Sequence, residues 1–165
     1  MKILILSAST GGGHMRAAEA IESYLLEHDS GDEVKIVYSI LYANSLYNKT
    51  VTNGYVYLAT KTPKLYGKLY ESTNKDSKMN HFVSRMNSFF ARKLLPLVEE
   101  YKPDIIITTH PFPTEMVSKL KGKNLVNIPL LCVMTDYAPH KAWINDNVDC
   151  YIVSNDDMVE EMVLQ

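Results

Sequence analysis

Three consecutive glycines followed by a histidine separate a short apolar run from a helical pattern near the start of the chain. The apolar run is Lys2–Ser7, and the segment after it reads Ser9-Thr10-Gly11-Gly12-Gly13-His14. Beyond Arg16, small and apolar residues recur at helical spacing, at Ala17, Ala18, Ile21 and Leu25. A strand, a glycine-rich loop and a helix in this order form the first half of a βαβ unit, which restricts the chain to the α/β folds.

Four further runs rich in β-forming residues follow at 33–39, 104–109, 129–135 and 150–154. The first, third and fourth of the five runs are continuously apolar rather than alternating, as expected for strands that are covered on both faces. Strands that alternate with helices predict a doubly wound, mainly parallel sheet with helices on both faces.

The segment 41–102 is too long for a simple crossover between two strands. We expect it to form a helical insertion between the second and third strands, with helices near 44–60, after Pro63 and over 79–101. A last helix opens near 156, with Asn155 or Asp156 as its cap. The chain stops within this helix at Gln165, which we interpret as truncation.

Composition narrows the class of protein further. The 165 residues are 46% hydrophobic and 22% charged, which fits a single domain, 1–165, with a substantial core. The net charge of −2 argues against a nucleic-acid binder. Two cysteines, Cys132 and Cys150, are too few for a disulfide scaffold or a zinc site, so a cytoplasmic location is expected. No run approaches the roughly 18 apolar residues of a membrane span.

The glycine-rich loop predicts a ligand site. Glycines allow another molecule to approach the backbone closely, and the free N–H groups at a helix start favour an anion or a polar group. A plain tight turn is the alternative. The P-loop pattern is absent, and in the dinucleotide pattern G-x-G-x-x-G the last glycine would fall on Arg16. We therefore expect no nicotinamide or flavin cofactor.

Polar clusters also follow the third and fourth strands. Thr109-His110-Pro111-Phe112 follows one, and Thr135-Asp136 with His140 and Trp143 follows the other. The carboxyl ends of parallel strands meet at one edge, so these loops are expected to converge near His14. A neutral imidazole there can serve as a general base. Asp136 could orient that imidazole, stabilise its charged form or take a proton itself.

Two other interpretations of these residues remain open. His110 and Asp136 could instead cap the helices that follow them. The three histidines and Asp136 could also bind a metal, but they are spread over three loops without a metal-ligand spacing, so no metal is expected.

The segment 49–93 carries nine Lys or Arg residues against Glu71 and Asp76, although the whole chain is acidic. Aromatic residues are interleaved with these cations, among them Tyr55, Tyr57, Tyr66, Tyr70, Phe82, Phe89 and Phe90. Cations combined with aromatic side chains suit docking to an anionic membrane surface. The alternative is a solvated helical face whose aromatic residues belong to the core.

Three motifs together resemble those of the monogalactosyldiacylglycerol synthase and processive diacylglycerol glucosyltransferase family. The first is Gly-Gly-Gly-His at 11–14 with the helix start after it, and the second is His110-Pro111. The third runs from Thr135-Asp136 through His140 and Trp143 to the segment 148–153. Their order covers nearly the whole chain. Plant members carry an acidic residue two positions before the first glycine, where this chain has Ser9.

The resemblance implies the amino-terminal, Rossmann-like half of a GT-B fold, which binds the lipid acceptor. A carboxyl-terminal domain, absent here, would hold a UDP-sugar as co-substrate. The whole enzyme would transfer glucose or galactose to diacylglycerol with inversion, peripherally on the inner face of the cell membrane, and the fragment alone would be inactive.

In this interpretation His14 and Asp136 are catalytic. The predicted substrate-binding residues are Thr10, Gly11, Gly12, Gly13, His110, Pro111, Phe112, His140 and Trp143. Alternatives are another GT-B enzyme, such as an N-acetylglucosaminyltransferase or a UDP-sugar epimerase, or a non-catalytic α/β module that binds a lipid or another ligand.

Overall fold

A five-stranded parallel sheet organises the chain. The computed structural model describes residues 1–9, 12–28, 31–62, 64–65, 67–68, 78–138 and 140–164. The strands are β1 (Lys2–Ser7), β2 (Glu33–Tyr38), β3 (Ile105–Thr108), β4 (Leu130–Val133) and β5 (Cys150–Ile152). They lie in the order β2-β1-β3-β4-β5, and all four pairings are parallel. The predicted α/β, doubly wound architecture is confirmed.

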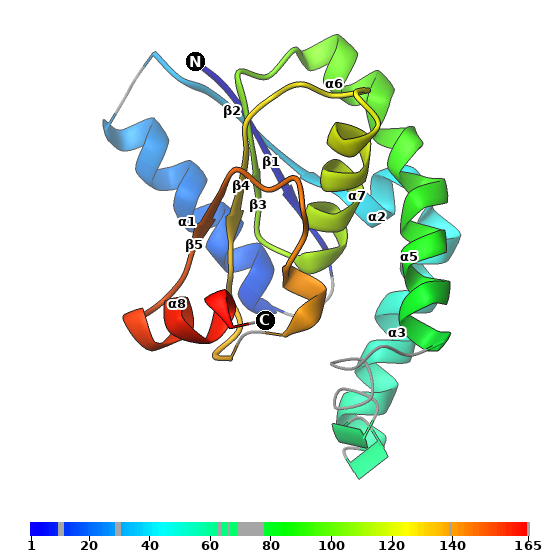
Figure 1. Cartoon of the computed structure of the whole chain (residues 1–165). Helices are drawn as coiled ribbons and strands as arrows, with labels where there is room; N and C mark the ends of the chain where they lie inside the picture. Colours follow the sequence, from blue (N-terminus) through cyan, green and yellow to red (C-terminus); the bar gives the residue numbers. More distant parts are fainter. Residues whose placement is uncertain are drawn as a thin grey trace.

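Helices cover both faces of the sheet (Figure 1). Helix α1 (Gly12–His28) connects β1 with β2 on one face, and α7 (Pro111–Gly122) connects β3 with β4 on the other. Between β2 and β3 the described residues form the expected helical insertion. Its elements are α2 (Ser39–Ala43), α3 (Ser45–Lys61), α5 (Lys78–Ala91), the 3-10 turn η1 (Arg92–Leu94) and α6 (Leu95–Tyr101). A second 3-10 turn, η2 (Lys141–Trp143), precedes β5, and α8 (Asp156–Val163) follows it.

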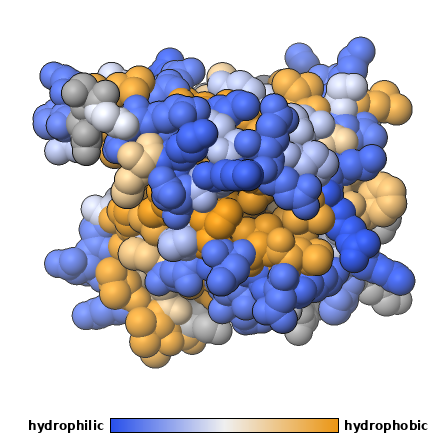
Figure 2. All heavy atoms as spheres, turned by 90° about the horizontal axis from the view of Figure 1, so that it is seen from above, coloured by the Kyte–Doolittle hydropathy of each residue, from blue (hydrophilic) through white to orange (hydrophobic). Residues whose placement is uncertain are grey.

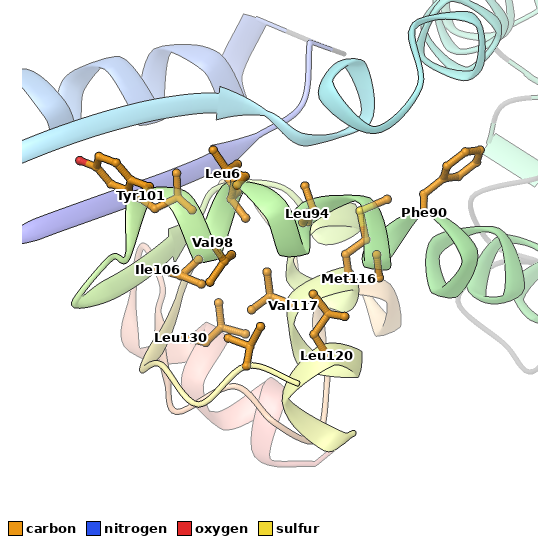
Figure 3. Close-up of a cluster of buried hydrophobic side chains, with 14 residues drawn as sticks. Leu6, Phe90, Leu94, Val98, Tyr101, Ile106, Met116, Val117, Leu120 and Leu130 are labelled. Carbon is orange, nitrogen blue, oxygen red and sulfur yellow. The ribbon is translucent and has the colours of Figure 1, made fainter. Parts of the chain in front are cut away.

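The alternation of side chains along the strands builds two apolar layers. Leu4 and Leu6 of β1 point to the layer under α5, α6 and α7, where they meet residues such as Leu94 and Met116 (Figure 3). Ile3 and Ile5 point to the opposite layer, against Ala18 and its neighbours on α1. Because β1 is buried on both faces, its sequence is continuously apolar, as the strand pattern indicates.

Four of the five predicted strands are shorter in the structure, and residues at the ends of β2 and β3 make contacts outside the sheet. Ser39 begins α2 instead of ending β2, and its buried hydroxyl donates to the carbonyl of Ser7. Asp104 precedes β3, and its carboxylate accepts from the backbone N–H of Lys2. At the other end of β3, the carbonyl of Thr109 is directed to a side chain rather than to a neighbouring strand.

The predicted helix over 79–101 is divided in the structure. Helix α5 ends at Ala91, the 3-10 turn η1 follows, and α6 starts at Leu95. Pro96 lies in the first turn of α6, where its missing N–H costs nothing, whereas inside a continuous helix it would break a hydrogen bond. The first helix begins at Gly12, a turn earlier than the apolar spacing indicates, because glycines carry no periodic signal. The expected cap Asn155 is confirmed, since its side chain accepts from the N–H of Met158 at 2.9 Å.

Apolar residues also reach the surface. Figure 2, which views the molecule from above, shows an apolar area in the middle of this face with hydrophilic residues on either side. In the part of the chain that the structure describes, no helix has the length and apolar character needed to cross a bilayer.

Candidate active site

His14 lies where the connections between strands switch from one face of the sheet to the other. Helix α1 leaves β1 on one face and α7 leaves the neighbouring β3 on the other, so the loops after these two strands diverge. In doubly wound sheets of this strand order, such a divergence forms the crevice that binds ligands. His14 Nδ1 bridges it, lying 2.9 Å from the carbonyl oxygen of Thr109.

The contacts of His14 determine which ring nitrogen carries the proton. The carbonyl of Thr109 can only accept, so Nδ1 donates to it and Nε2 keeps its lone pair. The hydroxyl oxygen of Thr135 lies 2.6 Å from the same Nδ1. Nε2 makes no hydrogen bond to any residue that the structure describes. This nitrogen is therefore available to accept a proton.

Burial lowers the pKa of His14 from its ordinary value, while the charge of Asp136 and the hydrogen bond to Thr109 oppose that shift. A lowered pKa keeps the imidazole neutral at pH 7, the form that a general base requires. The electrostatic environment therefore favours the base role predicted for His14.

His110 packs against His14 and caps helix α7. Its ring meets that of His14 edge to face, with 4.5 Å between the centroids. Its Nδ1 accepts from the N–H of Phe112 at 3.1 Å, which is the capping contact considered as an alternative from the sequence. Burial and the neighbouring His14 hold its pKa well below the ordinary value. Pro111 and Phe112 form the first turn of α7, and the Phe112 ring lies 5.0 Å from His110.

Asp136 contacts Trp143 rather than His14. The indole Nε1 donates to its carboxylate at 2.7 Å, and within the described residues no hydrogen bond joins Asp136 to His14. Asp136 acts on His14 only through space, by its charge. Among the described residues the next helical turn, η2, is capped by His140, so the capping role considered for Asp136 is wrong. Trp143 itself is fully buried, 6.1 Å from the His14 ring.

The remaining predicted residues lie on the same edge or outside the described residues. His140 is almost fully buried and caps η2, accepting from the N–H of Ala142. Gly12 and Gly13 are exposed in the first turn of α1, and a Cβ at either position would meet no atom within 4 Å. Packing within the described residues therefore does not require glycine at either position. Thr10 and Gly11 lie outside the described residues.

Sequence reasoning assigned no role to two threonines that hold the imidazole. Thr109 contributes its carbonyl, and its hydroxyl lies 3.0 Å from the carbonyl oxygen of His14 and 2.9 Å from the hydroxyl of Ser7. Thr135 contributes its hydroxyl from the end of β4. Both threonines belong to polar runs at strand ends, and this pattern is the sequence signal that could have pointed to them. Spacing alone does not show which polar residue faces the histidine.

A family model described as monogalactosyldiacylglycerol (MGDG) synthase matches residues 14–165. The chain belongs to this family. A processive diacylglycerol beta-glucosyltransferase of Bacillus cereus (strain B4264) is 34% identical over 98% of the chain and 41% of its own length. Proteins of the same name from Bacillus cytotoxicus and Bacillus thuringiensis (strain Al Hakam) are 34% and 32% identical, with the same coverage.

These matches fit an amino-terminal domain of the family. The chain spans about two fifths of the length of these curated relatives. The resemblance inferred from the three motifs is confirmed.

Proposed function

We propose that this chain forms the acceptor-binding side of a glycosyltransferase that transfers a hexose from a UDP-sugar to diacylglycerol. The observation that carries the proposal is the position of His14 Nε2 at the ligand-binding edge of the sheet, where it makes no hydrogen bond to any described residue. Membership of a family with diacylglycerol glucosyltransferases supports the substrate class. We assign the UDP-sugar to a further domain of roughly 150–200 residues, a usual domain size.

The proposed reaction is a single displacement. The acceptor hydroxyl gives its proton to Nε2 of His14 while its oxygen bonds to the anomeric carbon. The bond from that carbon to the diphosphate breaks, and UDP leaves with the electron pair. One displacement inverts the anomeric carbon. Asp136 lies close enough to favour the imidazolium as it forms.

The first test replaces the proposed base. General-base catalysis is worth about 10²–10⁴-fold in rate, so His14→Ala in the full-length protein is expected to lose turnover by that factor. Product formation from UDP-glucose or UDP-galactose and diacylglycerol vesicles measures it, and proton NMR of the product reports the anomeric configuration. Near-normal turnover of the variant would show that the base assignment is wrong, and retention would exclude a single displacement. Residues 1–165 alone are expected to be inactive.

Docking to the membrane is the second part of the proposal. The exposed basic residues of this segment include Lys61, Lys64 and Arg85. Large apolar side chains of the same segment are also exposed, among them Tyr57 on α3, Leu65, and Phe89 on α5. Phe90, in contrast, is buried in the core, so the aromatic residues divide between surface and interior. Tyr66 and Tyr70 lie outside the described residues. Exposed cations with apolar neighbours favour an anionic lipid surface, at about 1 kcal/mol per cation.

Vesicle sedimentation tests this docking surface. We expect stronger binding to anionic than to neutral vesicles, and weaker anionic binding for the double variant Lys61→Gln with Lys64→Gln. The matched control changes Lys102 and Lys123 to Gln, because these exposed cations follow α6 and α7, outside the basic segment 49–93. Equal binding to both vesicle types would contradict the electrostatic mechanism.

We place the enzyme on the cytoplasmic side of the membrane, where its two cysteines would stay as the free thiols that the structure shows.

A further inference from the structure

The ring of His14 is held from one side by two neutral oxygen atoms. Nδ1 lies 2.9 Å from the carbonyl oxygen of Thr109 and 2.6 Å from the hydroxyl oxygen of Thr135. These atoms follow β3 and β4, which are neighbours in the sheet. The place behind the imidazole that a carboxylate often occupies in catalytic triads is thus occupied by a carbonyl and a hydroxyl.

The two oxygens have different effects. The carbonyl cannot donate, so it alone fixes the proton on Nδ1, whereas a hydroxyl is compatible with either tautomer. With Nδ1 protonated, Thr135 can accept from the same N–H. When Nε2 gains a proton the ring becomes cationic, and hydrogen bonds from a charged donor are about twice as strong as neutral ones. Both oxygens therefore stabilise the ring most in its protonated form.

The surroundings keep both oxygens in place. The hydroxyl of Thr109 contacts the backbone carbonyl of His14, so this residue holds the histidine at the main chain and at the ring. After Thr135 the chain is anchored by the hydrogen bond between Asp136 and Trp143. Asp136 and His110 are the titratable groups shown to affect His14, the first by its charge and the second by ring contact.

We propose that Thr135 is a positioning residue whose hydroxyl, together with the carbonyl of Thr109, orients the His14 imidazole with Nε2 toward the acceptor and stabilises the imidazolium. The part of this proposal that concerns sugar transfer rests on the proposed function. The placement of the proton on Nδ1 is independent of the reaction.

The kinetic test compares Thr135→Val with Thr135→Ser in the full-length protein. Valine has the shape of threonine without the hydroxyl, so we expect kcat to fall about tenfold, as the loss of one hydrogen bond to a charged group predicts. KM for the acceptor should stay unchanged. The acidic limb of the kcat/KM profile should move to lower pH, because the imidazolium loses an acceptor. Thr135→Ser should restore both kcat and the position of the acidic limb.

Thr108→Val is the matched control. Thr108 is a buried threonine at the end of β3, and its hydroxyl contacts Thr114 and the carbonyl of Leu131 instead of His14. We expect this variant to lose stability while the acidic limb of its pH profile stays in place. If Thr135→Val behaves in the same way, Thr135 has only a structural role and the proposal is overturned.

An NMR titration separates this inference from the proposed function. In the chain labelled with 15N-histidine, the signal of His14 is identified among five histidines by its loss in His14→Gln. We expect the Nδ1–H tautomer at neutral pH and a lower His14 pKa in Thr135→Val. The Nε2–H tautomer, or an unchanged titration, would overturn the inference even if His14 proves essential. The expected spectra would support it even if His14→Ala kept full transfer activity.

Discussion

Replacing Gly13 with alanine is expected to stabilise the chain and yet reduce its activity. Gly13 lies in the first turn of α1, and a Cβ there would meet no atom within 4 Å. Alanine at such a position lowers the conformational entropy of the unfolded chain, which is worth about 0.5–1 kcal/mol. In a chain of this size, 1 kcal/mol corresponds to about 2–4 °C, so the melting temperature should rise by about 1–4 °C.

The same methyl group occupies the space that we assign to the acceptor or to the sugar diphosphate. We expect the transfer rate of the full-length protein at low substrate concentration to fall about tenfold or more, which corresponds to about 1.4 kcal/mol of lost binding. Thermal unfolding followed by circular dichroism measures the first effect, and glycolipid formation measures the second. Opposite changes in stability and activity would indicate a glycine kept for a ligand rather than for the fold.

Gly54 provides the matched control. It lies within α3, and a Cβ there also meets nothing within 4 Å. Gly54→Ala is expected to stabilise the chain by about 1 kcal/mol, the usual helix preference for alanine, with unchanged transfer to a water-soluble acceptor. The reasoning would be refuted if Gly13→Ala and Gly54→Ala raised the melting temperature equally and neither changed transfer. In that case no molecule approaches the glycine loop.

Of three further predictions, two concern residues around the site and one concerns the contact between α5 and α7. His110 has a pKa well below its ordinary value, so the unfolded chain binds a proton below about pH 6.5 that the folded chain refuses. The free energy of unfolding should therefore fall as the pH decreases from 7 to 5, by at most about 1.4 kcal/mol per pH unit for this group. His110→Asn keeps a capping side chain, and denaturant titrations should show a flatter pH dependence for this variant. Trp143→Phe removes the indole donor to Asp136 and should lower the free energy of unfolding by about 1–3 kcal/mol. A double-mutant cycle with Asp136→Asn should show a coupling energy above about 0.5 kcal/mol, and additive effects would contradict the contact. Lys119 on α7 pairs with Glu115 at 2.8 Å and donates to Ser88 of α5, so Lys119→Met should cost about 1.5–3 kcal/mol in urea unfolding, with partial recovery in the double variant with Glu115→Gln. An unchanged unfolding midpoint for Lys119→Met would show that this network does not hold the two helices together.

The sequence alone determined the sheet and its helices, because these depend on local patterns. Continuous apolar runs such as Lys2–Ser7 mark strands that are buried on both faces, and glycines after the first run mark the loop at the ligand-binding edge. The position of His14 beside the loops after β3 and β4 follows from this topology, so the convergence of the three polar clusters was predictable. Family motifs supplied the substrate class that we propose, which local physics does not specify.

The tertiary structure alone decided which polar side chain faces which. Asp136 was a candidate partner of His14, yet its carboxylate accepts from the Trp143 indole, and the imidazole is held by Thr109 and Thr135. His110 caps a helix while also packing against His14, so its capping role does not remove it from the neighbourhood of the histidine. The physical reason is that a hydrogen bond depends on distances of a few tenths of an ångström between residues about a hundred positions apart. Residue spacing indicates the order of the strands along the chain, but only packing fixes those distances.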